Sequence, residues 1–139
     1  MNKYSLFFTS LLISITACSE VNKVEKLNYP IEKIVQAIID HKDLRKYFYS
    51  EKIGRVPLLI SGQEVDSEFK VKKFRKKVLV SKDKNIKGAH LKFTVFECKF
   101  NNYCNVVFKY EPEGITGSTG VVINPDGSIH LEKTDISRK

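Results

Sequence analysis

One segment of this chain repeats its apolar residues at helical spacing, and the sequence that follows it alternates as strands do. The apolar face of this segment consists of Ile31, Ile34, Val35 and Ile38. Asn28 and Pro30 precede it, as a capping residue and a first-turn proline do. A break near His41 separates the helix from a short second one that contains Leu44. From Val56 onward, apolar and polar residues alternate in short runs, which is typical of strands.

A helix with an apolar face needs a partner, and a sheet is the only other element that the pattern offers. We therefore expect an α+β fold, with an N-terminal helix packed on a curved antiparallel β-meander of about five or six strands. The parity of the apolar residues changes near Lys72–Lys73 and again between Val95 and Phe96, and each change predicts a β-bulge. This element order resembles the cystatin-like and NTF2-like architectures, and the resemblance concerns the fold alone.

The C-terminal residues predict a β-hairpin. Residues 120–123 and 128–131 read as strands, and the four residues Asn124-Pro125-Asp126-Gly127 join them. Pro at the second turn position and Gly at the fourth favour a type I turn followed by a left-handed residue. Residues 111–114 predict a longer loop before this hairpin, and we interpret Gly114, Gly117 and Gly120 as loop glycines.

Two cysteines in the second half of the chain, Cys98 and Cys104, are spaced for a cross-strand pair. Both have the same parity, so they lie on one face of a hairpin. A turn centred on Asn101 places them directly opposite each other, and Asn accepts the left-handed conformation that such a turn needs. We expect these two cysteines to form a disulfide that fixes the hairpin register, because the N-terminal residues described next predict export to an oxidising compartment.

The N-terminus carries an export signal. Lys3 precedes an uncharged apolar run from Leu6 to Ala17. This run is too short to span a bilayer and is typical of the central region of a signal peptide.

Ile15-Thr16-Ala17-Cys18 ends that run and resembles the lipobox of bacterial lipoproteins. The resemblance covers residues 1–18. It implies that the Cys18 sulfur receives diacylglycerol, that a peptidase cuts before Cys18, and that the new N-terminus is acylated. The expected organisation is a signal peptide over 1–17, a lipidated cysteine and tether over 18–28, and one α+β domain over 29–139. Ser19 in the next position favours the outer membrane, on its periplasmic face, in a bacterium with two membranes.

The chain is basic, with 24 Lys and Arg against 16 Asp and Glu and a formal charge of +8. Removing the leader takes away only Lys3, which leaves +7. The densest cationic cluster predicts a binding surface for anions. It contains Lys70, Lys72, Lys73, Arg75, Lys76 and Lys77. The alternative is a lysine-rich edge strand that resists aggregation. In a cell envelope the available anions are lipids, glycans and acidic proteins, and export argues against nucleic acid.

No catalytic or cofactor motif accompanies these features. The sequence shows no local signature that joins a nucleophile to a base. His41, His90 and His130 are far apart, no spacing predicts a metal site, and there is no glycine-rich phosphate loop. We therefore expect no cofactor and no enzymatic activity.

The leading hypothesis is a binding module at the membrane surface. The alternatives are an immunity or inhibitor lipoprotein against an acidic toxin or hydrolase, and a small-ligand carrier or enzyme that uses the mouth of the curved sheet.

Overall fold

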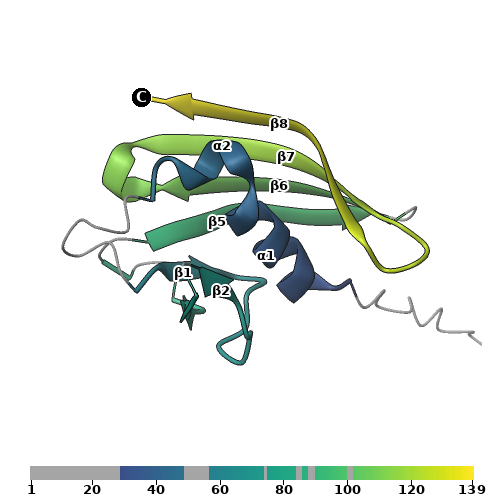
Figure 1. The fold of residues 1–139 in the computed structure, drawn as a ribbon, viewed down its shortest axis with the longest axis horizontal. Coiled ribbons are helices and arrows are strands. Elements are labelled where there is room, and N and C mark those ends of the chain that lie inside the picture. The colour runs from purple at the N-terminus through teal and green to yellow at the C-terminus, as the bar shows by residue number, and fades with distance from the viewer. Residues whose placement is uncertain (1–28, 49–56, 74, 84–85, 88–89, 100–101) are drawn as a thin grey trace, which may run out of the picture.

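Two short helices and a six-stranded sheet form the main body of the described structure (Figure 1). The computed structural model describes residues 29–48, 57–73, 75–83, 86–87, 90–99 and 102–139. Residues 1–28, which include Asn28, Cys18 and the predicted tether, lie outside the described residues. The elements are α1 (Ile31–Asp40), α2 (Lys42–Arg45), β1 (Leu59–Gly62), β2 (Lys72–Lys73), β3 (Lys76–Lys77), β4 (Leu79–Ser81), β5 (His90–Lys99), β6 (Tyr103–Tyr110), the 3₁₀-helix η1 (Glu111–Glu113), β7 (Ile115–Ile123) and β8 (Ile129–Arg138).

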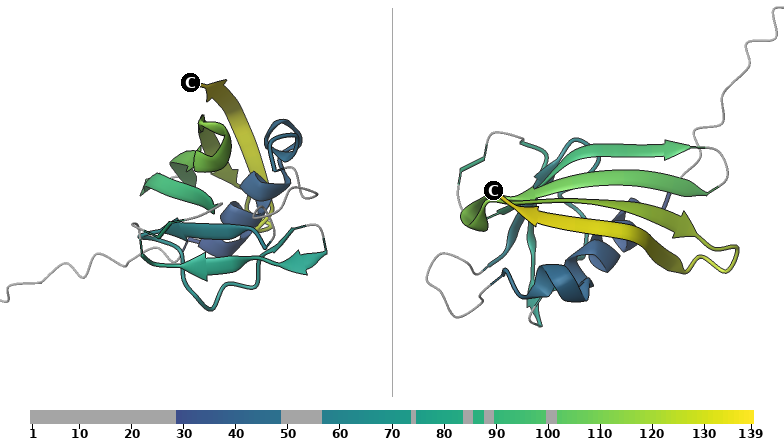
Figure 2. Two further views of the ribbon diagram at one scale, coloured as in Figure 1. Left: turned by 90° about the vertical axis from the view of Figure 1, so that its left-hand side faces the viewer. Right: turned by 90° about the horizontal axis from the view of Figure 1, so that it is seen from above.

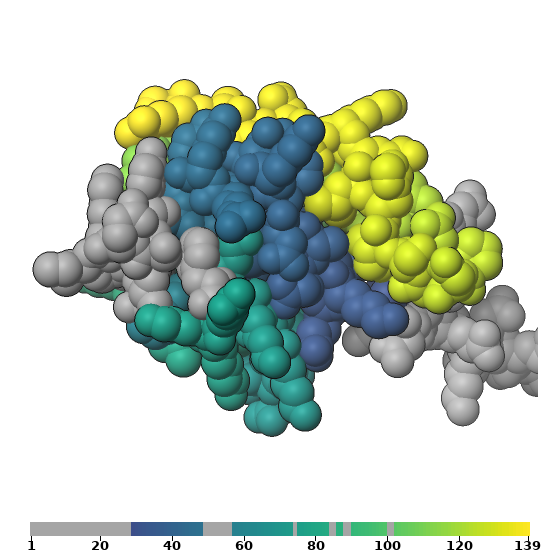
Figure 3. Space-filling view, in the orientation of Figure 1, coloured from purple at the N-terminus to yellow at the C-terminus, as the bar shows by residue number. Residues whose placement is uncertain are grey.

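Helix α1 buries the apolar face that its spacing predicts. Its buried residues are Ile34, Val35, Ile38 and Ile39. The helix begins after Pro30 and ends at His41, whose Nδ1 accepts a hydrogen bond from the Asp43 amide at 3.3 Å and so caps α2. The predicted break and second helix are therefore confirmed. Figure 2 shows α1 lying across one face of the sheet, and Figure 3 shows the helices between β8 and the segment that contains β2 and β3.

The strand order in the sheet is β4-β1-β5-β6-β7-β8. Strands β5 to β8 form the predicted antiparallel meander, and the α+β class is confirmed. The prediction of antiparallel pairing throughout is wrong for β1, which pairs in parallel with both β4 and β5. Alternation in a sequence reports that a strand has two different faces and carries no information about the direction of its neighbours.

Residues 72–77 fold differently from the bulged strand that the sequence predicts. Strands β2 and β3 form a two-residue antiparallel ladder in which Lys72 pairs with Lys77 and Lys73 with Lys76. Arg75 in the connecting turn has φ of 61°, a left-handed conformation that an L-residue adopts at a cost. The parity change therefore marks a tight hairpin in place of a bulge. Phe74, the other turn residue, lies outside the described residues.

The second predicted bulge is confirmed in β5, where the register against β6 shifts between Phe93 and Val95. The extra residue, Thr94, is exposed, and its Oγ1 donates to the Val107 carbonyl at 3.2 Å. Because of this shift, Phe93 and Phe96 lie on the same face of the sheet, with ring centroids 6.1 Å apart.

Two glycines that the sequence placed in loops lie inside β7. Gly117 and Gly120 are buried, and each faces an aromatic residue on β6. A Cβ at Gly117 would overlap the Phe108 ring, and a Cβ at Gly120 would overlap Tyr103 Oη. Their place in a strand could not be predicted from the sequence, because glycine occurs both in turns and at strand positions where an aromatic ring needs room.

The C-terminal hairpin forms as predicted, with longer strands. Gly127 has φ of 78°, and its amide donates to the Asn124 carbonyl at 2.8 Å. Asp126 accepts from the Ser128 amide and hydroxyl, and these hydrogen bonds lower the pKa of the Asp126 carboxyl. The loop predicted over residues 111–114 is confirmed as the connection between β6 and β7, and it contains η1 followed by Gly114 with φ of 62°.

Candidate functional site

The cationic cluster of the sequence lies on the β2–β3 segment beside α1, and we call residues 70–77 the basic hairpin. Five of its described residues are exposed: Lys70, Lys72, Arg75, Lys76 and Lys77. The short ladder holds these cations close together on one small protrusion. The structure therefore brings together five of the six cations that the sequence assigned to an anion-binding surface.

Gln36 of α1 holds the basic hairpin to the helix. Its Nε2 donates to the Lys72 carbonyl at 2.9 Å, and its Oε1 accepts from the Lys72 amide at 2.9 Å. The same Nε2 lies 2.7 Å from Asp40 Oδ2. One side-chain amide thus satisfies both backbone groups of a residue in a strand only two residues long, which fixes the hairpin against α1.

Lys73 is placed differently from the other five cations, because its side chain turns inward and is only 6% exposed. Its Nζ donates to the Ile39 carbonyl at 2.6 Å, lies 3.4 Å from Asp40 Oδ1, and sits 5.3 Å from the centre of the Phe48 ring. Burial lowers the pKa of the Lys73 ammonium, and Asp40 offsets part of this effect. Lys73 therefore closes the C-terminal end of α1 and is not part of the exposed surface.

A hollow of about 460 Å³ lies where the basic hairpin meets the helices. Its lining consists of Gln36, Asp40, Arg45, Lys72, Lys73 and Arg75. Arg45 belongs to α2 and was not among the predicted site residues, because its separation of 27 positions from Lys72 hides the contact. Arg45 is also close enough to Lys73 for their repulsion to contribute to the lowered pKa of Lys73. The hollow is therefore cationic overall, with Asp40 as its one lining carboxylate.

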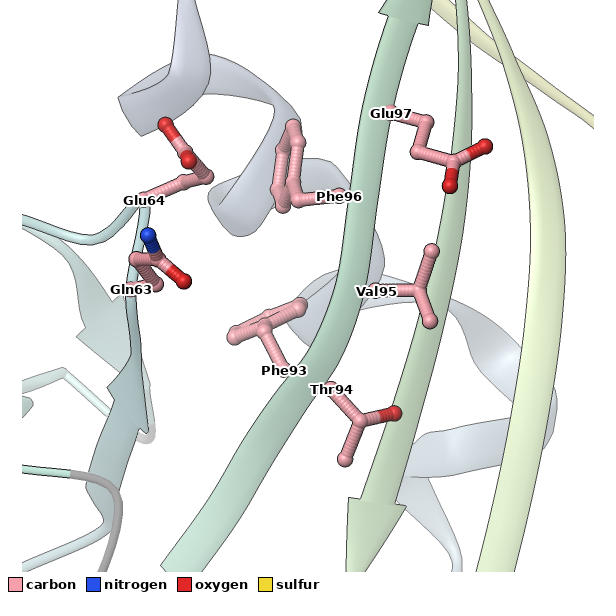
Figure 4. A pocket seen from close by; sticks show the side chains of 7 residues that line it. All are labelled: Gln63, Glu64, Phe93, Thr94, Val95, Phe96 and Glu97. Carbon is pink, nitrogen blue, oxygen red and sulfur yellow. The ribbon is translucent and has the colours of Figure 1, made fainter.

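A second hollow, of about 230 Å³, lies beside β5 where β1 ends (Figure 4). Gln63 and Glu64 line it on one side, and the lining residues of β5 are Phe93, Thr94, Val95, Phe96 and Glu97. Figure 4 shows the Phe93 and Phe96 rings pointing toward Gln63 and Glu64. No sequence motif indicates this hollow, because it depends on where two strands part.

Cys98 and Cys104 form the predicted disulfide, with S–S 2.03 Å, and they face each other in the β5–β6 register. The register centres on Asn101 as predicted, although Asn101 itself lies outside the described residues. Asn102 supplies the left-handed conformation of this turn, with φ of 55°.

The three histidines are spread over three elements. His41 caps α2, and His130 is exposed on β8. His90 is buried at the start of β5 with Nε2 3.5 Å from Glu111 Oε2. In the part of the chain that the structure describes, no three His, Cys, Asp or Glu residues gather as metal ligands would.

Comparison with known proteins identifies no relative: no family model matches the chain, and neither does a curated protein or a solved structure. Within the described residues, no helix is long and apolar enough to cross a membrane.

Proposed function

We propose that this chain is a lipid-anchored protein of a bacterial cell envelope, and that its domain is a non-enzymatic module whose basic hairpin binds anionic lipid headgroups. The lipobox-like sequence before Cys18 supports the anchor. The observation that carries the binding role is the attachment of the basic hairpin to α1 through Gln36, which presents five exposed cations on a fixed base.

The backbone of Arg75 supports a functional role for these cations. Its left-handed conformation costs roughly 1 kcal/mol relative to glycine. A solubilising edge needs a charge somewhere on the strand, but it does not need one at this strained turn. Lys133 of β8 also has a left-handed backbone, with φ of 47°, so the support comes from the place of Arg75 in the lining of the 460 Å³ hollow together with its strain.

The positions of the anchor and the basic hairpin are compatible with one membrane surface. Gln36 lies six residues into α1, so the hairpin contacts the helix about 8 Å along the axis from its first residue. The tether predicted over residues 18–28 spans up to roughly 35 Å when extended. The hairpin can therefore reach the bilayer in which the acyl chains are inserted.

The expected energies are sufficient for such an arrangement. A basic residue close to an anionic membrane contributes about 1 kcal/mol, and acyl chains already hold the protein at the surface. The main effect of the basic hairpin is then to orient the domain on the membrane, because the acyl chains already hold the protein there. We also propose that the fold resembles the cystatin-like or NTF2-like architectures in its order of elements. The parallel pairing of β1 with β5 differs from the all-antiparallel sheet that this resemblance implied.

Vesicle binding tests the proposal. We expect the mature chain, residues 18–139 with Cys18→Ser, to bind vesicles that contain phosphatidylglycerol and to ignore vesicles of phosphatidylcholine alone. Cosedimentation measures the bound fraction, and added salt should lower it because exposed charges are screened. The double variant Lys70→Glu, Lys76→Glu should lose most of the binding.

The matched control is the double variant Lys109→Glu, Lys133→Glu, which changes the net charge equally on exposed residues of β6 and β8. This variant should bind as the parent does. Equal losses in both variants would reduce the effect to net charge and overturn the proposal. Absence of vesicle binding, with a stoichiometric acidic protein recovered by crosslinking in cells, would replace it with the inhibitor function.

A further inference from the structure

We propose that residues 94–99 of β5, with the hollow beside them, bind an extended peptide that carries Lys or Arg and adds to the sheet as a further strand. This site is separate from the basic hairpin and does not depend on the function proposed above.

Among the described strands, none covers the edge of β5 beyond Phe93. Strand β1 pairs with β5 only from His90 to Phe93, whereas β5 continues to Lys99. Among the described residues, no strand pairs with 94–99 on the side away from β6. Six residues of strand extend about 20 Å, which is enough for a short peptide to pair with. Tyr29 Oη donates to the Lys99 carbonyl at 2.6 Å, so Tyr29 lies beside the last residue of β5.

The register shows which backbone groups face the edge. The Cα atoms of Cys98 and Cys104 are 4.0 Å apart, the close spacing of a non-hydrogen-bonded antiparallel pair. Cys98 therefore directs its N–H and C=O away from β6, and so does Phe96 two residues earlier. An added strand finds a donor and an acceptor at each of these positions, as in other proteins that recognise peptides by extending a sheet.

The hollow lies where such a strand would run. A Cβ at Gly62 would come within 3.0 Å of Phe93 Cβ, so β1 approaches β5 very closely at its last residue. The chain then turns away toward Val65, which is buried in the core. The gap that opens, about 230 Å³, is smaller than a typical small-molecule pocket of roughly 300–1,000 Å³. It suits one or two side chains of an extended peptide.

Side chains along the edge alternate in chemistry. Figure 4 shows Phe93 and Phe96 pointing into the hollow and Val95 and Glu97 pointing to the opposite side of β5. Successive residues of an added strand also point to opposite faces. The peptide would therefore place apolar residues beside Phe96 and alternate residues beside Glu97.

Carboxylates on both sides of the β5 edge select a cationic occupant: Glu64 lies on the side of the hollow, and Glu97 points to the opposite side of β5. Two of the residues that line the hollow, Glu64 and Glu97, are carboxylates and none is a cation. This local sign is the reverse of the chain's formal charge of +8. Lys99 stands at the end of the edge, so the matching cations of the peptide belong near Glu97, on the side of β5 opposite the hollow, and not beyond it.

The test uses a capped peptide of sequence Lys-Val-Lys-Val-Lys and ¹⁵N NMR of the mature chain with Cys18→Ser. We expect the Phe96 and Cys98 amides to shift and to exchange more slowly with solvent. The same peptide N-methylated at alternate residues should not bind, and neither should Glu-Val-Glu-Val-Glu. Glu97→Lys should weaken binding roughly fivefold, because one cross-strand attraction becomes a repulsion.

The matched control is Glu132→Lys, an equal charge change at an exposed position of β8. It should leave the affinity unchanged. Equal binding of the N-methylated peptide, or shifts confined to other elements, would overturn strand addition. If the protein forms a dimer in light scattering without peptide, and the same two amides are protected in that dimer, the occupant of the edge is a second copy of the chain. That result would overturn the proposal of a peptide partner.

Discussion

Lys73 has lost most of its contact with water, although the nearby Lys72, Lys76 and Lys77 are exposed. Its ammonium lies over the Phe48 ring and donates a hydrogen bond to the Ile39 carbonyl, and its side chain is only 6% exposed. Lys73→Ala should lower the free energy of unfolding by about 3 kcal/mol, because it removes both the packing and the donor. Lys73→Met keeps the stem and should cost about half as much. Urea unfolding of the two variants measures this difference, and equal costs would contradict the packing role.

The lowered pKa of Lys73 makes stability depend on pH. Between its folded-state pKa and the ordinary value of 10.5, the unfolded chain binds more protons than the folded chain. Raising the pH through that window should therefore stabilise the protein. Lys73→Met lacks this term, so the stability of the parent relative to Lys73→Met should rise as the pH approaches 10.5. A difference that stays flat or falls would rule out a desolvated ammonium.

Arg75 should show opposite effects on stability and on binding. Arg75→Gly relieves the left-handed backbone and should raise the free energy of unfolding by about 1 kcal/mol. The same change removes a cation from the basic hairpin and should weaken binding to phosphatidylglycerol vesicles. Thermal unfolding and cosedimentation of one preparation measure both effects. A variant that gains stability and binds fully would show that Arg75 has no part in docking.

Within β7, Gly117 and Gly120 allow a comparison of two aromatic neighbours. Phe108, beside Gly117, is buried and fixed in the core, whereas Tyr103, beside Gly120, is 36% exposed. Gly117→Ala should therefore cost about 2–3 kcal/mol, because the ring cannot move away. Gly120→Ala should cost about 1 kcal/mol or less, because Tyr103 can swing into solvent. Chemical denaturation of both variants tests this order, and the reverse order would contradict it.

At the turn between β5 and β6, the disulfide closes a short loop. Such a loop restricts the unfolded chain only slightly, so Cys98→Ser with Cys104→Ser should lower the free energy of unfolding by about 2 kcal/mol. The parent protein under reducing conditions is the control and should behave like the double variant. A much larger loss would mean that the bridge also maintains native packing.

The elements that the sequence predicts well are those whose determinants are local. Helix α1, the β8 hairpin and the cysteine pair each depend on spacing and turn residues within about a dozen positions. The inward turn of Lys73, the contact of Arg45 and the parallel pairing of β1 depend on residues far apart in the sequence. Alternation cannot distinguish a bulged strand from the tight β2–β3 hairpin, because both reverse the parity of the apolar positions. Neither hollow could be predicted, because the residues that line each hollow come from segments far apart in the sequence.

At the scale of the whole protein, the proposed lipid anchor is the hypothesis most open to direct measurement. Mass spectrometry of the native protein should find an N-terminus at Cys18 that carries diacylglycerol and an amide-linked fatty acid. Cys18→Ser should abolish acylation and leave the chain unprocessed. A native protein that retains Met1, or that begins at an unmodified cysteine, would contradict both the anchor and the localisation.

The parallel placement of β1 also bears on how the chain reaches its native state. Strands β5 to β8 are neighbours in both sequence and sheet, so their loops close early and at little entropic cost. Strand β1 must meet β5 across an interval of about thirty residues, and contacts of that kind form slowly. A ribosome or a translocon releases β1 first, and until β5 has emerged only the three-residue strand β4 is available to pair with it. The N-terminal half of this domain therefore assembles on a scaffold made by the half that is synthesised last.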